Sequence, residues 1–222
     1  MERAGPGFLI NLLHWIALSL LDLLFRVFNR VEVQGREHIP SRGERGVLFL
    51  SNHISALDPF LIGITAMPRF SSVWWRAAAK EELFTRGFSR AVMYLIGAFP
   101  VRRRKRDIES MDRMTEVLKT DVLVVFPEGT WSASGELLPG RSGVGKVIYD
   151  ARPAKIIPAA VKGTDGILPR GSWIPRIGRR AKIIYGPPMD LGRFYQRPPD
   201  LETSQQIVAA VMAEIGRLYA SL

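Results

Sequence analysis

The chain has 222 residues, 47% of them hydrophobic, which is enough apolar material for one domain with a full core. It has no cysteine, which excludes disulfides, thiolate metal sites and a cysteine nucleophile, and with only three histidines a histidine-rich metal site is not expected. The formal net charge of +10 indicates an anionic partner: nucleic acid, an anionic membrane surface or a phosphate-bearing substrate.

The segment that begins at Phe8 is rich in Leu, Ile and Trp and predicts an amphipathic helix. Its uncharged run ends at Leu21, which is short of the ~20 residues that span a bilayer, and no signal-peptide cleavage site follows. Such a helix can lie in a membrane interface or pack on its own domain, and the basic charge of the chain favours the membrane. Its polar side would carry Asn11, His14, Ser19, Asp22, Arg26, Asn29 and Arg30, and its apolar side Leu9, Leu12, Leu13, Ile16, Leu20, Leu23, Leu24 and Phe28.

Strand patterns alternate with helical patterns along the rest of the chain. Strands are predicted at 31–35, 46–51, 121–126, 155–161 and 180–185, and helices at 59–66, 80–95, 107–119, 144–151 and 202–222. This alternation predicts one α/β domain over residues 31–222, with a mixed, largely parallel sheet flanked by helices. Residues 1–30 would form the amphipathic, membrane-associating helix in front of it.

The first candidate site follows the predicted strand at 46–51, because functional residues in α/β sheets gather beyond strand ends. His53 and Asp58 lie five residues apart there. A histidine can take the proton of an attacking hydroxyl, and a carboxylate on its other ring nitrogen fixes the tautomer. Structural alternatives exist, since Asp58 before Pro59 can cap a helix, His53 can be a hydrogen-bonded loop residue, and Asn52 can stabilise the turn.

Two further segments occupy similar positions. Phe126-Pro127-Glu128-Gly129-Thr130 follows another buried strand, where it can direct polar groups into a cleft or form a simple turn with a solvated Glu128. The segment from Gly97 to Arg103 brings guanidinium groups to a strand end, and these suit phosphate oxygens. The basic run 102–106 lacks the interleaved aromatic residues typical of nucleic-acid binding, so we expect no nucleic-acid partner.

Together these segments resemble the glycerolipid acyltransferases of the lysophosphatidate/glycerol-3-phosphate type, the PlsC-like family with an NHxxxxD motif. The histidine–aspartate spacing alone is common by chance, but its combination with the later FPEGT sequence is specific and favours functional roles for both residues. The resemblance extends over about residues 31–186. Four blocks match in the family's order, namely Asn52-His53…Asp58, Gly97–Arg103, Phe126-Pro127-Glu128-Gly129-Thr130 and Ile157-Pro158-Ala159.

The resemblance implies that His53 is the general base and that Asp58 orients it. It implies acyl-CoA or acyl-carrier protein as the co-substrate, no cofactor and no metal. The implied partners are a membrane surface and a lysophospholipid, with the chain on the cytoplasmic face of the membrane. Separately from the resemblance, we expect the chain to be a monomer. The expected substrate-binding residues are Asn52, Arg103, Glu128, Gly129, Thr130 and Arg141.

The sequence also departs from the family pattern. Trp131 follows FPEGT where a basic residue is common, and we expect Arg141 to supply the missing charge. Pro100 replaces a more usual apolar residue. The expected reaction is acyl transfer to 1-acylglycerol-3-phosphate to give phosphatidate, and the alternative acceptors are glycerol-3-phosphate or another lysolipid. A non-catalytic basic membrane-binding protein is the alternative of a different class, and it leaves the pairing of the two motifs unexplained.

Overall fold

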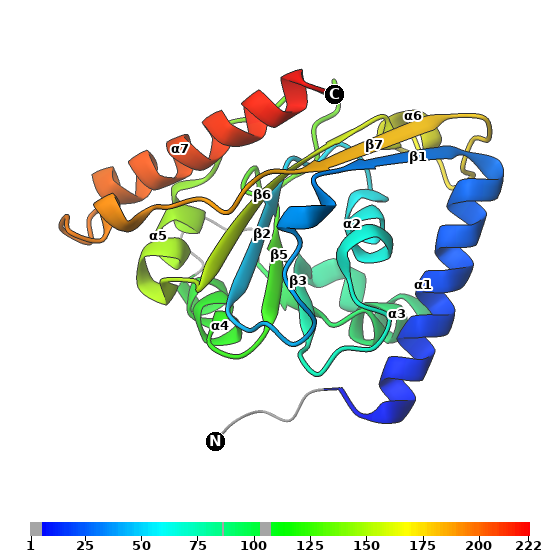
Figure 1. The fold of residues 1–222 in the computed structure, drawn as a ribbon, viewed down its shortest axis with the longest axis horizontal. Helices are drawn as coiled ribbons and strands as arrows, with labels where there is room; N and C mark the ends of the chain where they lie inside the picture. The colour runs from blue at the N-terminus through cyan, green and yellow to red at the C-terminus, as the bar shows by residue number, and fades with distance from the viewer. Residues whose placement is uncertain (1–5, 86, 103–107) are drawn as a thin grey trace.

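The computed structural model describes residues 6–85, 87–102 and 108–222 and arranges seven strands in one sheet of order β1-β7-β6-β2-β5-β3-β4 (Figure 1). The block from β6 to β4 is parallel throughout, β6 meets β7 antiparallel, and β1 pairs parallel with β7. The strands are β1 (Arg30–Gln34), β2 (Val47–Ser51), β3 (Trp75–Lys80), β4 (Ala98–Val101), β5 (Val122–Val125), β6 (Lys155–Lys162) and β7 (Arg180–Tyr185).

Helices cover both faces of the sheet, with α1 and α2 on one side and α5 and α7 on the other (Figure 1). The α-helices are α1 (Phe8–Phe28), α2 (Asp58–Ala66), α3 (Gly87–Leu95), α4 (Ile108–Leu118), α5 (Ser142–Ala151), α6 (Thr164–Ile167) and α7 (Leu201–Ala220), and the short 3₁₀ helices are η1 (Arg36–His38), η2 (Glu81–Phe84) and η3 (Gly192–Phe194). The predicted fold class is therefore confirmed: a mixed, largely parallel sheet flanked by helices, with an apolar helix at the amino terminus.

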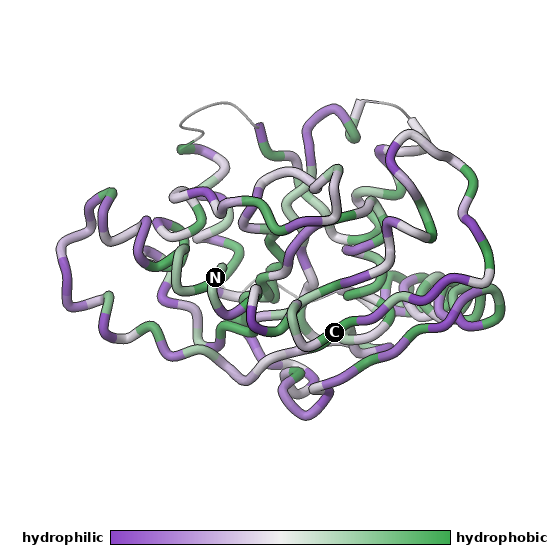
Figure 2. The backbone as a smooth tube through the Cα atoms, turned by 90° about the horizontal axis from the view of Figure 1, so that it is seen from above, coloured by the Kyte–Doolittle hydropathy of each residue, from purple (hydrophilic) through white to green (hydrophobic). Residues whose placement is uncertain are grey.

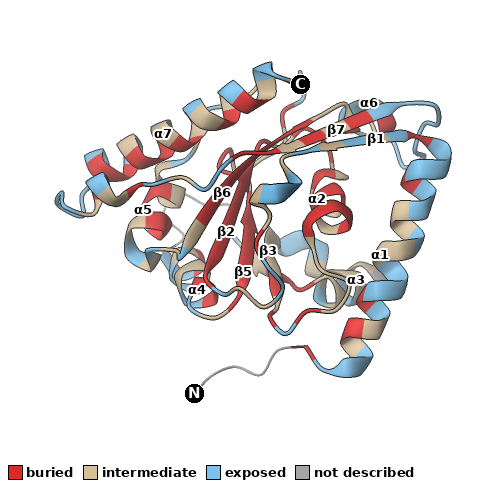
Figure 3. Ribbon diagram, viewed as in Figure 1, coloured by how far each residue is buried: buried red, intermediate tan, exposed pale blue. Residues whose placement is uncertain are grey.

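The central strand β2 is buried on both faces. Val47 and Phe49 join the core beneath α1 and α2, while Leu48 and Leu50 join the core beneath α5 and α7. A strand with two covered faces needs an uninterrupted apolar run, which is the pattern that the sequence carries here. Figure 3 shows the same burial along the neighbouring strands β5 and β6. The two cores hold the ends of these strands in fixed positions.

The predicted helix over residues 80–95 is wrong in its first part. Lys80 ends β3, Glu81–Phe84 form the 3₁₀ helix η2, and the α-helix begins only at Gly87. Strand β3 was not predicted, because its Trp-Arg-Ala-Ala-Ala-Lys sequence has strong helix formers and no β-branched residue. Pairing with β5 on one side and β4 on the other overrides that preference.

Helix α1 packs on the domain with the side that carries Asn11, His14 and Phe25, and it leaves most of its predicted apolar side exposed. Asn11 and His14 are buried, where Asn11 pairs with the backbone of Ser71 and His14 with the carbonyl of Leu95. The predicted apolar side is open, and Leu9 and Leu23 are 67% and 57% exposed. By length and composition alone, this 21-residue helix is also able to cross a membrane. Figure 2 shows it nearly end-on at the edge of the molecule, where hydrophobic residues predominate.

Candidate active site

The candidate site lies at the carboxyl edge of the parallel strands. Because Leu50 of β2 pairs with Val125 of β5, the turns that follow the two strands are neighbours. The backbone N–H of Ser132 donates to the carbonyl of His53 at 2.7 Å and ties these turns together. The structure therefore brings the two predicted motifs, 52–58 and 126–130, into one place.

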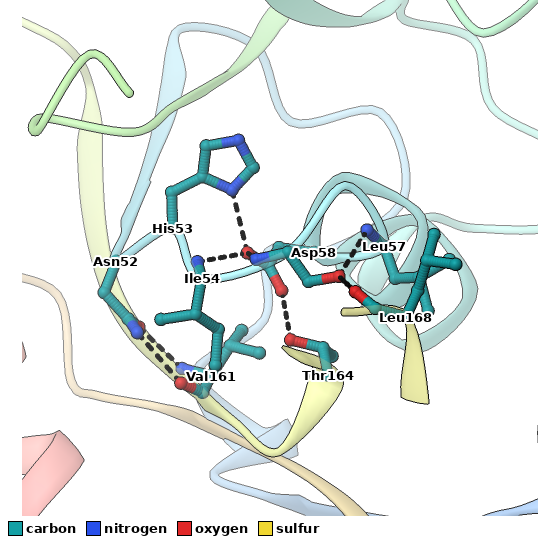
Figure 4. A network of polar contacts seen from close by, with 9 residues as sticks. Asn52, His53, Ile54, Leu57, Asp58, Val161, Thr164 and Leu168 are labelled. Atoms are coloured by element: carbon teal, nitrogen blue, oxygen red, sulfur yellow. Dashed lines mark hydrogen bonds and ion pairs between the residues drawn. The ribbon is translucent and has the colours of Figure 1, made fainter. Parts of the chain in front are cut away.

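His53 and Asp58 form a direct pair. The His53 Nδ1 atom lies 2.8 Å from the Asp58 Oδ2 atom, and the aspartate is fully buried while the histidine side chain keeps 12% of its surface exposed (Figure 4). Among the described residues no protein group hydrogen-bonds the second ring nitrogen, Nε2, which points away from Asp58 in Figure 4. With Nδ1–H donating to the carboxylate, Nε2 is the nitrogen left to accept a proton.

Asp58 is held by hydrogen bonds that a helix cap would not make. Its Oδ2 atom accepts the backbone N–H groups of Ile54 at 2.7 Å and Ser55 at 2.8 Å, and its Oδ1 atom accepts the hydroxyl of Thr164. It occupies the first position of α2, where the capping position is Leu57 and no side chain caps the helix. The capping alternative for Asp58 is therefore wrong, and the carboxylate is instead fixed to face His53.

Aromatic rings flank the histidine. The His53 ring stacks on Phe126 with ring centroids 4.1 Å apart and planes 16° apart, and Trp131 lies 6.0 Å away. These rings restrict the rotation of the imidazole, so Nε2 keeps one direction. Trp131, at the position where the family pattern has a basic residue, thus contributes an apolar surface beside the histidine.

Asn52 lies beneath the site, fully buried. Its side-chain amide donates to the carbonyl of Val161 at 2.9 Å, and its carbonyl oxygen accepts the N–H of the same residue at 2.7 Å. Both ends of the amide are therefore occupied by β6. This geometry favours a role in positioning the His53 turn over the predicted contact with substrate, because no donor or acceptor of the side chain faces outward.

Glu128 is buried, so the solvated alternative for it is wrong. It is 2% exposed, and neither carboxylate oxygen has a partner within hydrogen-bond geometry among the described residues. Burial is the main cause that raises its pKa, the backbone groups of Leu138 and His53 lower it, and the nearby charge of Asp58 raises it; the net pKa is about 7, against an ordinary value of 4.5. A buried acceptor without a partner, next to a histidine with a free nitrogen, is a feature of a binding site for a hydroxyl-bearing ligand.

The difference in unfolding free energy between the Glu128→Gln variant and wild type should shift in favour of the variant as pH rises. The folded pKa of about 7 lies above the unfolded value, so the folded state binds the proton more tightly and wild-type stability falls as pH rises through this interval. We expect the Glu128→Gln variant to gain roughly 2 to 3 kcal/mol of unfolding free energy over wild type between pH 5 and pH 8.

Urea unfolding of both proteins at the two pH values measures this gain. Glu136→Gln, a change at an exposed carboxyl in the following loop, is the matched control. An equal difference between wild type and Glu128→Gln at pH 5 and pH 8 would show that the buried carboxyl does not titrate in this range.

The side chain of Arg141 packs directly on the backbone of Gly129. Gly129 has a φ of +68°, and a side chain there would place its Cβ 2.6 Å from the Nε atom of Arg141. Arg141 donates from Nε to the carbonyl of Glu128 at 3.2 Å, and its backbone N–H donates to Pro127. The structure therefore brings the predicted Arg141 against the 126–130 turn, with Thr130 partly exposed on the same turn. The bare backbone of the glycine is what lets the guanidinium approach.

The predicted phosphate ligand Arg103 lies outside the described residues, and so does the rest of the basic run after Arg102. Sequence reasoning missed Thr164, which hydrogen-bonds Asp58, and the stacking ring of Phe126. Thr164 carried a usable signal, since it follows Gly163 directly after a buried strand at the same edge of the sheet.

Comparison with known proteins identifies a family. A family model described as Acyltransferase matches residues 30–162. A chloroplast 1-acyl-sn-glycerol-3-phosphate acyltransferase of Brassica napus is 28% identical over 163 residues, which are 72% of this chain and 45% of that protein. The Homo sapiens 1-acyl-sn-glycerol-3-phosphate acyltransferase alpha is 35% identical over 133 residues, 58% of this chain and 44% of that protein. The chain thus spans less than half the length of these two relatives.

The fold has a solved counterpart. The crystal structure of the 1-acyl-sn-glycerophosphate (LPA) acyltransferase PlsC from Thermotoga maritima superposes with a TM-score of 0.65 at 21% identity, covering 95% of this chain and 79% of that one. The stretch matched by the family model contains the His53–Asp58 pair and the Glu128 turn, and it is more than half of the 222 residues. The chain belongs to the Acyltransferase family.

Proposed function

We propose that the chain transfers a fatty acyl group from a thioester donor, acyl-CoA or acyl-carrier protein, to the free hydroxyl of 1-acylglycerol-3-phosphate, giving phosphatidate. The observation that carries this proposal is the 2.8 Å contact between His53 Nδ1 and Asp58 Oδ2, which leaves Nε2 free beside the Glu128 turn. The two relatives described above, whose names specify 1-acyl-sn-glycerol-3-phosphate acyltransferases, support the choice of acceptor.

His53 acts as the general base in the proposed reaction. Its Nε2 takes the proton of the acceptor hydroxyl while that oxygen attacks the thioester carbon. The tetrahedral intermediate then collapses, the carbon–sulfur bond breaks, and the leaving thiolate takes the proton back from the imidazolium. Asp58 holds the imidazole in one tautomer and stabilises its charged form. No enzyme nucleophile, metal or resident cofactor takes part in the proposed reaction.

The acceptor is held by the turn that follows β5. The unpartnered carboxyl of Glu128 accepts a hydrogen bond from a glycerol hydroxyl, and the exposed guanidinium of Arg141 faces the phosphate. Thr130 contributes a hydroxyl from the same turn, and Arg103 is proposed as a second phosphate ligand. Because Trp131 adds an apolar ring near the histidine, the acyl chain of the donor or acceptor has a surface to pack on.

Helix α1 holds the enzyme at a membrane in this proposal. Its exposed side carries Phe8, Leu9, Leu20 and Leu23, all more than half exposed, and such a surface is buried favourably at a lipid interface. The lysophospholipid acceptor and the phosphatidate product both reside in that membrane. We place the enzyme as a monomer on the cytoplasmic face, where both thioester donors would reach it.

A panel of acceptors tests the proposal. The purified chain is incubated with labelled acyl-CoA or acyl-carrier protein and with lysophosphatidate, glycerol-3-phosphate or a lysolipid that has another headgroup, and labelled lipid is resolved. We expect the highest kcat/KM with lysophosphatidate, because the Arg141 turn suits its terminal phosphate monoester and the Trp131 ring suits its acyl chain, which glycerol-3-phosphate lacks. A higher value for glycerol-3-phosphate or another lysolipid would replace the proposed acceptor, and absence of transfer to every acceptor would overturn the proposal.

A further inference from the structure

The connection between α6 and β7 carries a second exposed apolar surface, separate from α1. We call residues 168–179 the Trp173 loop. Residues 171–180 are all exposed, and Trp173 and Ile174, at 91% and 79%, have the highest exposed fractions among the large exposed hydrophobic residues described, with Ile177 at 70%. A contiguous set of large apolar side chains in water is unfavourable, which indicates that a partner covers them.

The Trp173 loop is fixed to the end of α1. The backbone N–H of Gly178 donates to the carbonyl of Phe28 at 2.7 Å, and the N–H of Arg179 donates to the side chain of Asn29 at 3.0 Å. The N–H of Arg176 donates to the carbonyl of Ile167, the last residue of α6, at 2.7 Å. Figure 1 shows this connection running beside the end of α1 from which β1 leaves. The carboxyl end of the loop is therefore attached to the carboxyl end of the helix.

A basic groove lies between the loop and the helix. It has a volume of about 500 Å³ and is lined by residues 26–30, Gly178 and Arg180. Arg30 and Arg180 are directly paired across β1 and β7, and among the described residues no carboxylate pairs with either of them. Arg176 and Arg179 add charge within the loop itself. Arginines beside exposed Trp and Ile side chains match the layered chemistry of a membrane surface, with anionic headgroups above an apolar interior.

We propose that the Trp173 loop and this arginine groove form a second membrane contact, in which Trp173, Ile174 and Ile177 enter the interface and Arg30 and Arg180 bind the phosphate of an anionic lipid. The inference extends the membrane attachment proposed for α1 and does not depend on acyl transfer. A single helix on a membrane is free to roll about its axis, and a second contact at its end removes that freedom.

This second contact is connected to the candidate active site. The hydroxyl of Ser55 donates to the carbonyl of Leu168 at 3.1 Å, at the start of the Trp173 loop, and Thr164 bonds Asp58 just before it (Figure 4). The loop thus joins the His53–Asp58 turn at one end to the helix and groove at the other. Contact with the membrane would set the orientation of the site relative to the lipid.

Vesicle flotation of the purified full chain tests the proposal. The vesicles are phosphatidylcholine alone or phosphatidylcholine mixed with phosphatidylglycerol. We expect Trp173→Ser/Ile177→Ser to weaken binding to both kinds by about tenfold or more, and Arg30→Gln/Arg180→Gln to remove the preference for the anionic vesicles. The matched controls lie on other parts of the surface: Leu201→Ser, at a residue 64% exposed in α7, and Lys119→Gln/Arg217→Gln, with the same loss of charge.

If α1 binds vesicles so tightly that flotation does not detect the loop, tryptophan fluorescence tests directly whether Trp173 enters the lipid. The contribution of Trp173 is the difference in emission between wild type and Trp173→Phe, and we expect brominated lipids to quench it. An unquenched Trp173, or equal binding by the groove variant and its charge control on anionic vesicles, would overturn the second contact. In detergent micelles the loop and groove variants should keep wild-type acyl transfer, so failure of the proposed reaction would leave the binding results unaffected.

Discussion

Replacing His53 with alanine should lower kcat for acyl transfer by about 10²- to 10⁴-fold, the range by which a positioned general base contributes. The reason is geometric, since Nε2 of His53 is the ring nitrogen that Asp58 leaves free, beside the proposed acceptor turn. The fold should persist, because the ring packs on Phe126 at the edge of the site and keeps part of its surface exposed. Initial rates with lysophosphatidate, measured beside circular dichroism and vesicle binding, check this expectation.

His38→Ala is the matched control for this variant. His38 also uses Nδ1 for a hydrogen bond, to the carbonyl of Tyr185 at 2.9 Å, but it lies in η1, away from the site. Its loss should leave kcat close to that of wild type. A His53→Ala protein that folds and turns over at a rate near wild type would remove the general base from the proposed mechanism.

Asp58→Asn should lower kcat by about 10²- to 10⁴-fold while the chain stays folded, as expected for loss of the carboxylate that stabilises an imidazolium. The amide fits the site because Asp58 Oδ2 accepts three donors, whereas Oδ1 meets only the hydroxyl of Thr164. A hydroxyl can accept as well as donate, so the new NH₂ group can take the place of Oδ1. The substitution therefore removes charge and preserves the hydrogen-bond pattern.

Asp58→Ala provides the contrast. It leaves the backbone N–H groups of Ile54 and Ser55 buried without an acceptor, and each such group costs about 1 to 3 kcal/mol. Urea unfolding should therefore separate a folded but slow Asp58→Asn from a destabilised Asp58→Ala. If Asp58→Asn turns over at a rate near wild type, the charge of Asp58 has no part in the reaction.

Sequence patterns predicted the fold class, the strands other than β3 and β4, and the pair at the edge of the sheet, because these depend on local features. Strand β2 reads as a continuous apolar run, and the residues that follow such a strand in a parallel sheet reach its carboxyl edge. The pattern could not give the contact between His53 and Phe126, which depends on β2 and β5 being neighbours. Which strands lie side by side is decided by the arrangement of the whole sheet and cannot be read from one segment.

The burial and orientation of some side chains also could not be predicted from the sequence. Glu128 reads as a solvated turn residue, yet its carboxyl is buried next to the backbone of Leu138 and His53. The polar residues Asn11 and His14 of α1 face the domain, where they form hydrogen bonds with the backbone of Ser71 and Leu95. Periodicity placed Asn11 and His14 on one side of this helix correctly, although Arg26 of the same predicted side is exposed and Phe25 is buried. Only the partners of each side decide which one faces outward.

The most direct test of the mechanism is a double-mutant comparison of kcat/KM for wild type, His53→Ala, Asp58→Asn and the double variant, all with lysophosphatidate. If Asp58 acts only through the imidazole of His53, the double variant loses no more activity than His53→Ala alone. Losses that multiply in the double variant would show that the two residues act independently, which contradicts a histidine base held by its aspartate.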